Sequence, residues 1–197
     1  MEFTRAELYM LLNLNREKPI WLVNADLSDL NLKICEFENA DLSLCNLSNA
    51  TLEFGRFKNA KLNNTNLYKA NFNDADFSNA ELIGAIASHA NFRLAQFHHA
   101  NLRGADLSYA SLAYANLSNA NLNLARLSNT DFTYAHIDGV NFTDASHIES
   151  ANFTDAIYND KTIWPDGFNP KAAGAKVQIL KVLKSGTVVD VTHAKKA

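Results

Sequence analysis

The chain has 197 residues, 47% of them hydrophobic, and a formal net charge of −3 at neutral pH. This length suits one domain with short additions. A negative net charge argues against a dedicated nucleic-acid-binding protein, which usually carries a basic patch. No apolar run approaches the roughly 18 residues that cross a bilayer, and the acidic start lacks the order of a signal peptide. The sequence therefore predicts a cytoplasmic protein without membrane insertion.

Residues 1–20 are predicted to form a short helical cap. Thr4 and Glu7 have the spacing of a capping box, and Phe3 and Leu8 stand at the two positions of a hydrophobic staple. Leucines then follow at helical spacing, and the helix should end before Pro19. We expect this helix to cover the first coil of the segment that follows.

A period of five residues dominates the chain from 21 to 158. A large apolar residue stands at every fifth position from Leu22 to Phe142, Ala87 excepted, and nearly every residue two places earlier is small. A period of five is neither the 3.6 of a helix nor the 2 of a strand, so it indicates a coil that returns to itself. The register slips by one residue within 145–150 and resumes at Ile148.

Four such units would close a coil of 20 residues. At this spacing one column is phenylalanine at 37, 57, 77 and 97. A corner column reads Asn39, Asn59, Asn79, His99, Asn119, Gly139. Asn and Gly tolerate the positive φ of a type II turn, so we expect type II turns along this edge.

The units Ala40-Asp41-Leu42 and Ala100-Asn101-Leu102 resemble the A(D/N)LXX pattern of the pentapeptide-repeat family. The resemblance covers about 21–158. It implies an all-β fold, a right-handed quadrilateral β-helix of about seven coils.

Residues 159–197 are predicted to form a C-terminal cap and basic tail. The segment 158–170 resembles the closing segment of cyanobacterial pentapeptide-repeat proteins, and Trp164 and Phe168 should cover the last coil. Beyond it a helix and a hairpin both stay open, although the β-branched run 187–191 favours a hairpin closed by 184–186. This tail holds 7 Lys and 3 Asp, whereas residues 21–158 hold 15 Asp and Glu against 8 Lys and Arg.

The sequence shows no sign of catalysis, of a cofactor or of a metal. Its carboxylates occupy the polar position of the repeat, and there is no glycine-rich phosphate loop or nucleophile elbow. His89 and His99 fall on opposite corners, and neither stacks over His136, so a metal site is not expected. Cys35 and Cys45 occupy small inward positions half a coil apart, which favours core packing over a disulfide.

One corner column departs from the Asn, Asp, Gly and Lys of the others. It reads Ile34, Phe54, Asp74, Leu94, Tyr114, Tyr134. An apolar column at a corner should be covered by another element, either the C-terminal tail or a second copy of the chain. Alternatively, the corners with large residues adopt another turn type. The functional alternative is a partner-binding strip, since aromatic residues anchor interfaces. Leu44 and Leu124 mark a sparser strip on the opposite edge.

Two functions are compatible with these patterns. The first is a non-catalytic scaffold that presents a rigid surface to a protein partner, with a homodimer through an end cap or the strip left open. The second follows from the resemblance, because gyrase-binding members of the family have acidic faces that imitate DNA to a type II topoisomerase. The acidic coils fit this second function, but their Lys and Arg residues interrupt the acidic surface, and no loop projects from the repeats.

Overall fold

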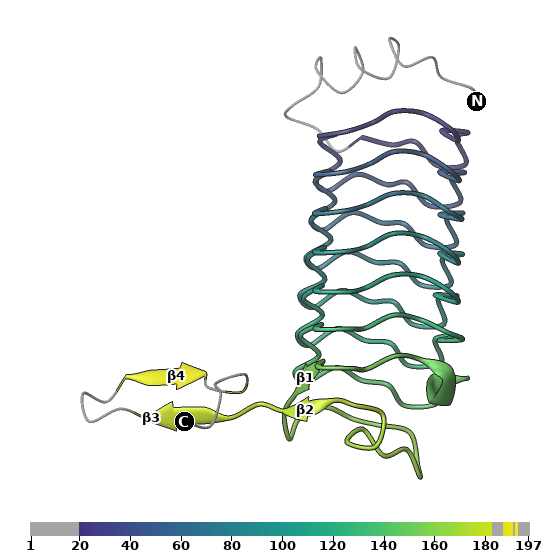
Figure 1. Ribbon diagram of the computed structural model, residues 1–197. Helices are drawn as coiled ribbons and strands as arrows, with labels where there is room; N and C mark the ends of the chain where they lie inside the picture. Colours follow the sequence, from purple (N-terminus) through teal and green to yellow (C-terminus); the bar gives the residue numbers. More distant parts are fainter. Residues whose placement is uncertain (1–19, 183–186, 191, 193–197) are drawn as a thin grey trace.

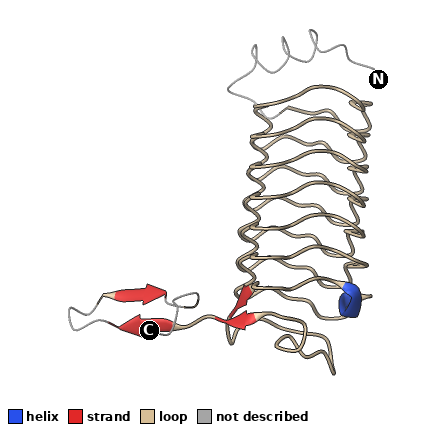
Figure 2. Cartoon of the chain, viewed as in Figure 1, coloured by secondary structure: helices blue, strands red, loops and turns tan. Residues whose placement is uncertain are grey.

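The chain winds into a rod of stacked coils in the computed structural model (Figure 1), which describes residues 20–182, 187–190 and 192. The predicted cap helix falls at 1–20 and so lies outside the described residues, apart from Ile20. Figure 2 draws the rod almost entirely as loops and turns, because most sides of a coil contribute a single bridged residue to the ladder.

Each coil contains 20 residues and four turns. Parallel bridges join residues 20 apart, from Trp21 with Asp41 to Arg126 with Ser146. Every fifth residue from 24 to 144 has a positive φ, and the next residue donates its N–H to a carbonyl three positions back, as Ala40 does to Phe37 at 3.0 Å. The residue before each of them has no positive φ, which is the type II pattern. The type II turns expected along the Asn39 edge are confirmed, and they recur on the other three edges.

The core contains one large and one small residue from each unit. The large residues from Leu22 to Phe142 are all buried. Phe57 stacks on Phe77 with ring centroids 4.8 Å apart, and Phe77 stacks on Phe97 at 4.9 Å. These separations equal the spacing of neighbouring strands, so each ring sits above the ring one coil earlier. The predicted phenylalanine column is confirmed.

The small positions leave room for the large ones. A Cβ on Gly55 would lie 2.6 Å from the Phe57 ring and 3.0 Å from the Cys35 sulfur, so no larger residue fits there without displacing them. Cys35 and Cys45 are buried, free thiols, and the Cys45 Sγ donates to the Leu22 carbonyl at 2.7 Å. Burial raises the pKa of the Cys35 thiol. Both cysteines are therefore core-filling residues, as predicted.

Where the residue between the small and the large one is Asp or Asn, its side chain adds a hydrogen bond to the backbone of the turn. Its side-chain oxygen accepts the backbone N–H two residues later, as in Ser43 to Asp41 at 3.0 Å and Ser108 to Asp106 at 2.9 Å. This N–H points out of the coil and takes no part in the ladder between coils. An Asp or Asn at this position thus provides an acceptor for a backbone N–H that makes no hydrogen bond between coils.

The coils absorb extra residues near the C-terminal end. The predicted slip is confirmed, because the 3₁₀ helix η1 (Ile148–Ser150) follows the Arg126–Ser146 bridge and shifts the next bridge to Asp131 with Asn152. A second slip, not anticipated, brings Ile163 opposite Asn141. It places Trp164 on Phe142 at 4.9 Å, so the inner stack continues beyond residue 158.

Two short sheets end the described chain. The β1 strand (Ile157–Tyr158) pairs in parallel with β2 (Lys176–Val177), while Phe168 packs edge-on against Phe153 with ring centroids 5.6 Å apart. Trp164 and Phe168 thus pack against the end of the core, as expected. The β3 strand (Leu180–Val182) pairs antiparallel with β4 (Val188–Asp190), which confirms the predicted hairpin.

Replacing Asp106 with Ala should destabilise the rod by roughly 0.5–1.5 kcal/mol, because the Ser108 N–H loses its acceptor. Chemical denaturation followed by circular dichroism measures this. Ser111 stands at the equivalent position of the next side and makes no side-chain hydrogen bond within the described chain, so Ser111→Ala is the matched control and should be near neutral. Equal effects of the two substitutions would contradict the role given to the carboxylate.

Candidate interaction surface

The apolar column predicted at one corner is exposed. We call Ile34, Phe54, Leu94, Tyr114 and Tyr134 the corner strip. Their exposed fractions run from 69% at Ile34 to 36% at Leu94, so no described segment covers them. Their φ angles lie between 57° and 62°, like those of the Asn corners. The expectation that large corner residues adopt another turn type is therefore wrong.

These residues have a strained, left-handed backbone conformation, and burial of their side chains does not compensate for the strain. The left-handed region disfavours residues with a Cβ by roughly 1–2 kcal/mol, and a β-branched residue such as Ile34 is a clear outlier there. Asn and Gly, which occupy many other corners, tolerate the same conformation far better. Bulky residues in a strained and exposed conformation indicate a constraint other than folding.

The C-terminal half of the corner strip is already ordered. Tyr114 and Tyr134 stack with ring centroids 5.0 Å apart, and the Arg93 guanidinium lies 4.4 Å from the centre of the Tyr114 ring. The Asp155 carboxylate hydrogen-bonds to Tyr134 and raises the pKa of its hydroxyl, and it also pairs with Lys176 of β2. The strip is thereby tied to the segment that leads into the hairpin.

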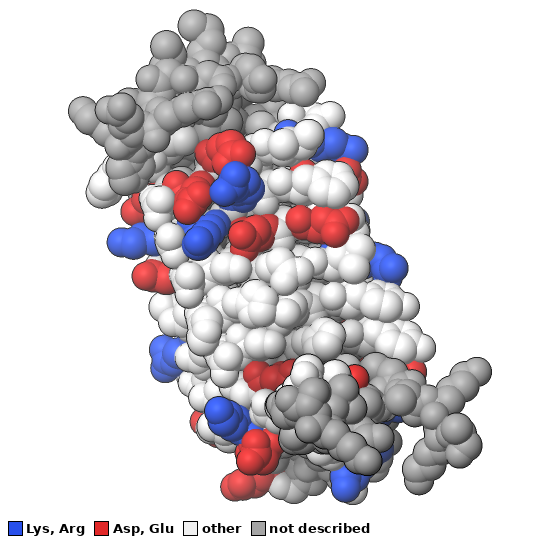
Figure 3. All heavy atoms as spheres, turned by 90° about the vertical axis from the view of Figure 1, so that its left-hand side faces the viewer, with Lys and Arg blue, Asp and Glu red and all other residues white. Residues whose placement is uncertain are grey.

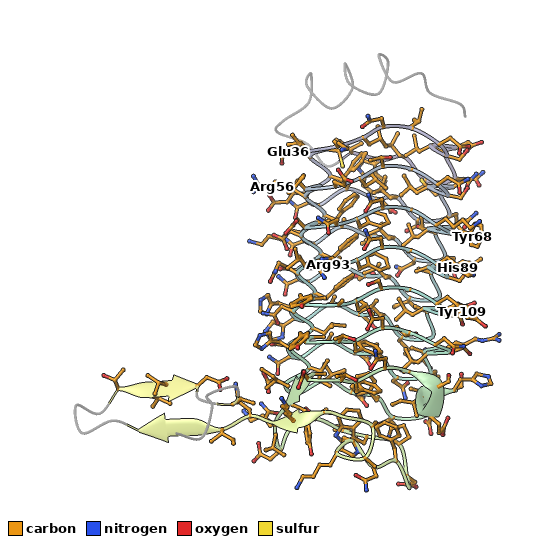
Figure 4. All side chains as sticks on the ribbon, viewed as in Figure 1. Glu36, Arg56, Tyr68, His89, Arg93 and Tyr109 are labelled. Atoms are coloured by element: carbon orange, nitrogen blue, oxygen red, sulfur yellow. The ribbon has the colours of Figure 1, made fainter. Side chains whose placement is uncertain are left out.

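A second aromatic cluster lies on the neighbouring corner and was missed by the sequence reasoning. His89 stacks on Tyr109 at 4.9 Å, and Tyr68 meets His89 edge-on at 5.7 Å. Figure 4 shows the three side chains one above another along the edge opposite Glu36 and Arg56. The sequence contains a signal for it, because His89 and Tyr109 are spaced by 20 residues at one corner, but this column is less apolar than the corner strip.

The opposite edge carries Leu44 and Leu124, with exposed fractions of 55% and 46%. Asn64 and Gly84 stand between them, and a Cβ on Gly84 would lie 2.6 Å from the Asn64 side-chain oxygen. The glycine therefore leaves space for the Asn amide. As the sequence indicated, this edge is a sparser strip than the corner strip.

Charges on the side shown in Figure 3 gather near the N-terminal end of the rod and alternate in sign. Arg56 lies 3.5 Å from both Glu36 and Glu38. The centre of this face shows neither Lys or Arg nor Asp or Glu, although basic residues lie at both its margins and charges of both signs recur at the C-terminal end (Figure 3). The ladder that holds Glu36 and Arg56 continues with Gln96 and Asn116. An apolar partner could cover this middle region without removing a charge from water.

In the described part of the chain, the His, Cys, Asp and Glu side chains form no group of three that could hold a metal ion. Burial raises the pKa of the Asp138 carboxyl, while His136 opposes this shift and Asp190 adds to it. None of the described helical segments is long and apolar enough to cross a membrane.

Replacing Ile34 with Asn should stabilise the protein by about 1 kcal/mol, since Asn tolerates the left-handed conformation and Ile34 gains little from burial. The midpoint of urea denaturation measures the change. Asn49 has a similar φ of 57° and its side chain makes no hydrogen bond within the described chain, so Asn49→Ile is the converse control and should destabilise by a similar amount. A loss of stability in Ile34→Asn would show that Ile34 supports the fold.

Comparison with known proteins agrees with the repeat. The sequence model of the family described as Pentapeptide repeats matches residues 22–53, 45–82, 75–112 and 110–146, with eight copies. No curated protein matches the chain.

Several solved structures are similar. HetL, a pentapeptide repeat protein involved in heterocyst differentiation regulation from the cyanobacterium Nostoc sp. strain PCC 7120, is 19% identical over 95% of this chain and 100% of its own, with a TM-score of 0.34. QnrB1, a plasmid-mediated fluoroquinolone resistance protein, is 19% identical over 81% and 92%, with a TM-score of 0.39. A pentapeptide repeat protein of the Arabidopsis thaliana thylakoid lumen is 38% identical over 53% and 66%, with a TM-score of 0.26. The family matches span most of the rod, and the chain belongs to the pentapeptide-repeat family, with its right-handed β-helix fold.

Proposed function

We propose that the protein is a non-catalytic scaffold that binds a protein partner through the corner strip. One observation carries the proposal: bulky apolar side chains are held exposed at one corner of successive coils, in a conformation that Asn or Gly would adopt at lower cost. A surface kept at a cost to stability is typical of a functional site.

The residue types and the order of the corner strip favour binding of a protein partner. The Tyr114–Tyr134 stack and the Arg93 contact hold three side chains of the residue types that dominate interface energies. Side chains that are ordered before binding lose less entropy when a partner covers them. The backbone beneath them is fixed by the ladder between coils, so the partner meets a rigid edge.

A second function, DNA mimicry toward a type II topoisomerase, is supported by the excess of acidic residues in the coils. A DNA mimic needs a continuous acidic surface, however, and here Arg56 pairs with two glutamates and Lys33 pairs with Glu53 at 2.5 Å. The uncharged middle of the face in Figure 3 also argues against it. We therefore favour the scaffold.

Replacing both Tyr114 and Tyr134 with Ser should leave the rod folded and lower its affinity for the partner about 30-fold, as removal of a hot spot worth about 2 kcal/mol implies. The measurement is a quantitative pull-down from the source organism, with circular dichroism on the same samples. The double variant Leu44→Ser/Leu124→Ser removes apolar area from the opposite edge and should recover the partner normally. Equal losses in both variants would overturn the assignment to the corner strip.

The alternative function has its own readout. A scaffold should leave DNA gyrase supercoiling unchanged even at a large molar excess of the protein. Inhibition at sub-micromolar protein, insensitive to the tyrosine substitutions, would favour mimicry by the acidic faces instead.

A further inference from the structure

The C-terminal hairpin stands away from the rod, as Figure 1 shows. Its sheet contains only β3 and β4, and no third strand pairs with either edge among the described residues. A lone two-stranded hairpin is marginally stable in water. Apolar side chains in and beside the hairpin are also exposed to water, with Ile179 54% and Val188 55% exposed. Among the described residues the hairpin therefore has no third strand to stabilise it.

The base of the hairpin is nevertheless held in place. The Gln178 amide donates to the Asp190 carboxylate at 3.2 Å, and the Ile179 N–H donates to the Thr192 hydroxyl at 2.7 Å. Thr192 in turn donates its N–H to Asp190 at 2.8 Å. These bonds fix the register of β4 against β3 and present the outer edge of β4 as a defined strand.

The two edges differ in chemistry. Natural edge strands carry lysine, proline or bulges that discourage pairing with another chain. The β3 strand contains Lys181, whereas β4 reads Val188-Val189-Asp190, without lysine or proline. The β4 edge thus has high strand propensity and lacks lysine and proline, with Asp190 as its one charge.

We propose that β4 pairs antiparallel with β4 of a second copy of this chain, so that two hairpins form one four-stranded sheet across a two-fold axis at Val189. This register places Val188 of each copy opposite Asp190 of the other. The like charges are thereby separated, whereas a parallel pairing would set them side by side. An isologous contact of this kind closes on itself and stops at the dimer. Because the strands are short, the dimer dissociates on dilution.

The proposal reaches beyond the scaffold function and uses a different surface. In such a dimer each rod keeps its own corner strip, so a partner with two binding sites would engage both strips with added avidity. The hairpin variants and the strip variants therefore test separate claims.

Sedimentation velocity of the full chain over a range from about 2 to 200 μM tests the dimer, the range being chosen for a weak interface. The wild type should shift from the monomer mass toward twice that mass as concentration rises. Val188→Lys places a protective charge on the exposed edge and should weaken the dimer at least tenfold, with an unchanged circular dichroism spectrum. Val188→Thr keeps the β-branch without the charge and should still dimerise. A wild type that stays monomeric throughout overturns the proposal.

Crosslinking tests the register even if Val188→Lys disturbs the hairpin itself. Val189→Cys should form an intermolecular disulfide under mild oxidation, because residues on the two-fold axis of an antiparallel pair lie directly opposite each other. Val177→Cys, at a 41% exposed position outside the hairpin, should not. The native cysteines are buried and do not compete. A dimer that fails to crosslink at residue 189, or that is lost in the Tyr114→Ser/Tyr134→Ser variant, would place the interface elsewhere and overturn the proposal.

Discussion

The structure depends on giving four of the five backbone N–H groups of each repeat a backbone acceptor while the chain turns every five residues. Three of the five N–H groups bond to neighbouring coils, as those of Leu42, Leu44 and Asp41 do. A fourth closes the turn, as in Cys45 to Leu42 at 3.1 Å. The fifth is accepted by the side chain two residues earlier wherever the repeat has an Asp or Asn there, as Asp41 accepts the N–H of Ser43. The repeat pattern is therefore as much a hydrogen-bonding pattern as a packing pattern.

The same constraint makes the corners informative. Each turn needs one residue with positive φ, and Asn, Asp and Gly meet that need at little cost. The core gains nothing from Ile34 or Phe54 at such a position, since both point into solvent. The fold itself does not require these residues there, because Asn, Asp or Gly meets the same need at most of the other corners.

The ends of the rod are stabilised by different interactions from its middle. In the middle each coil covers the next, so packing and hydrogen bonding are passed from neighbour to neighbour. At the C-terminal end Trp164 stacks on Phe142, Phe168 packs edge-on against Phe153, and β2 extends the ladder by pairing with β1. Beyond β2 the chain leaves the rod, and the hairpin keeps strand edges that no described segment covers.

The sequence by itself determined the period, the inward residues, the phenylalanine column and the slip at 145–150, because each depends on interactions that repeat every five or 20 residues. It also located the corner strip and the hairpin. Only the tertiary structure decided that all four edges turn alike, that Trp164 continues the inner stack after a second slip, and that Tyr68, His89 and Tyr109 meet. Those outcomes depend on contacts between particular coils, where an extra residue or a neighbouring ring shifts the register, and a repeat read from one unit cannot reveal them.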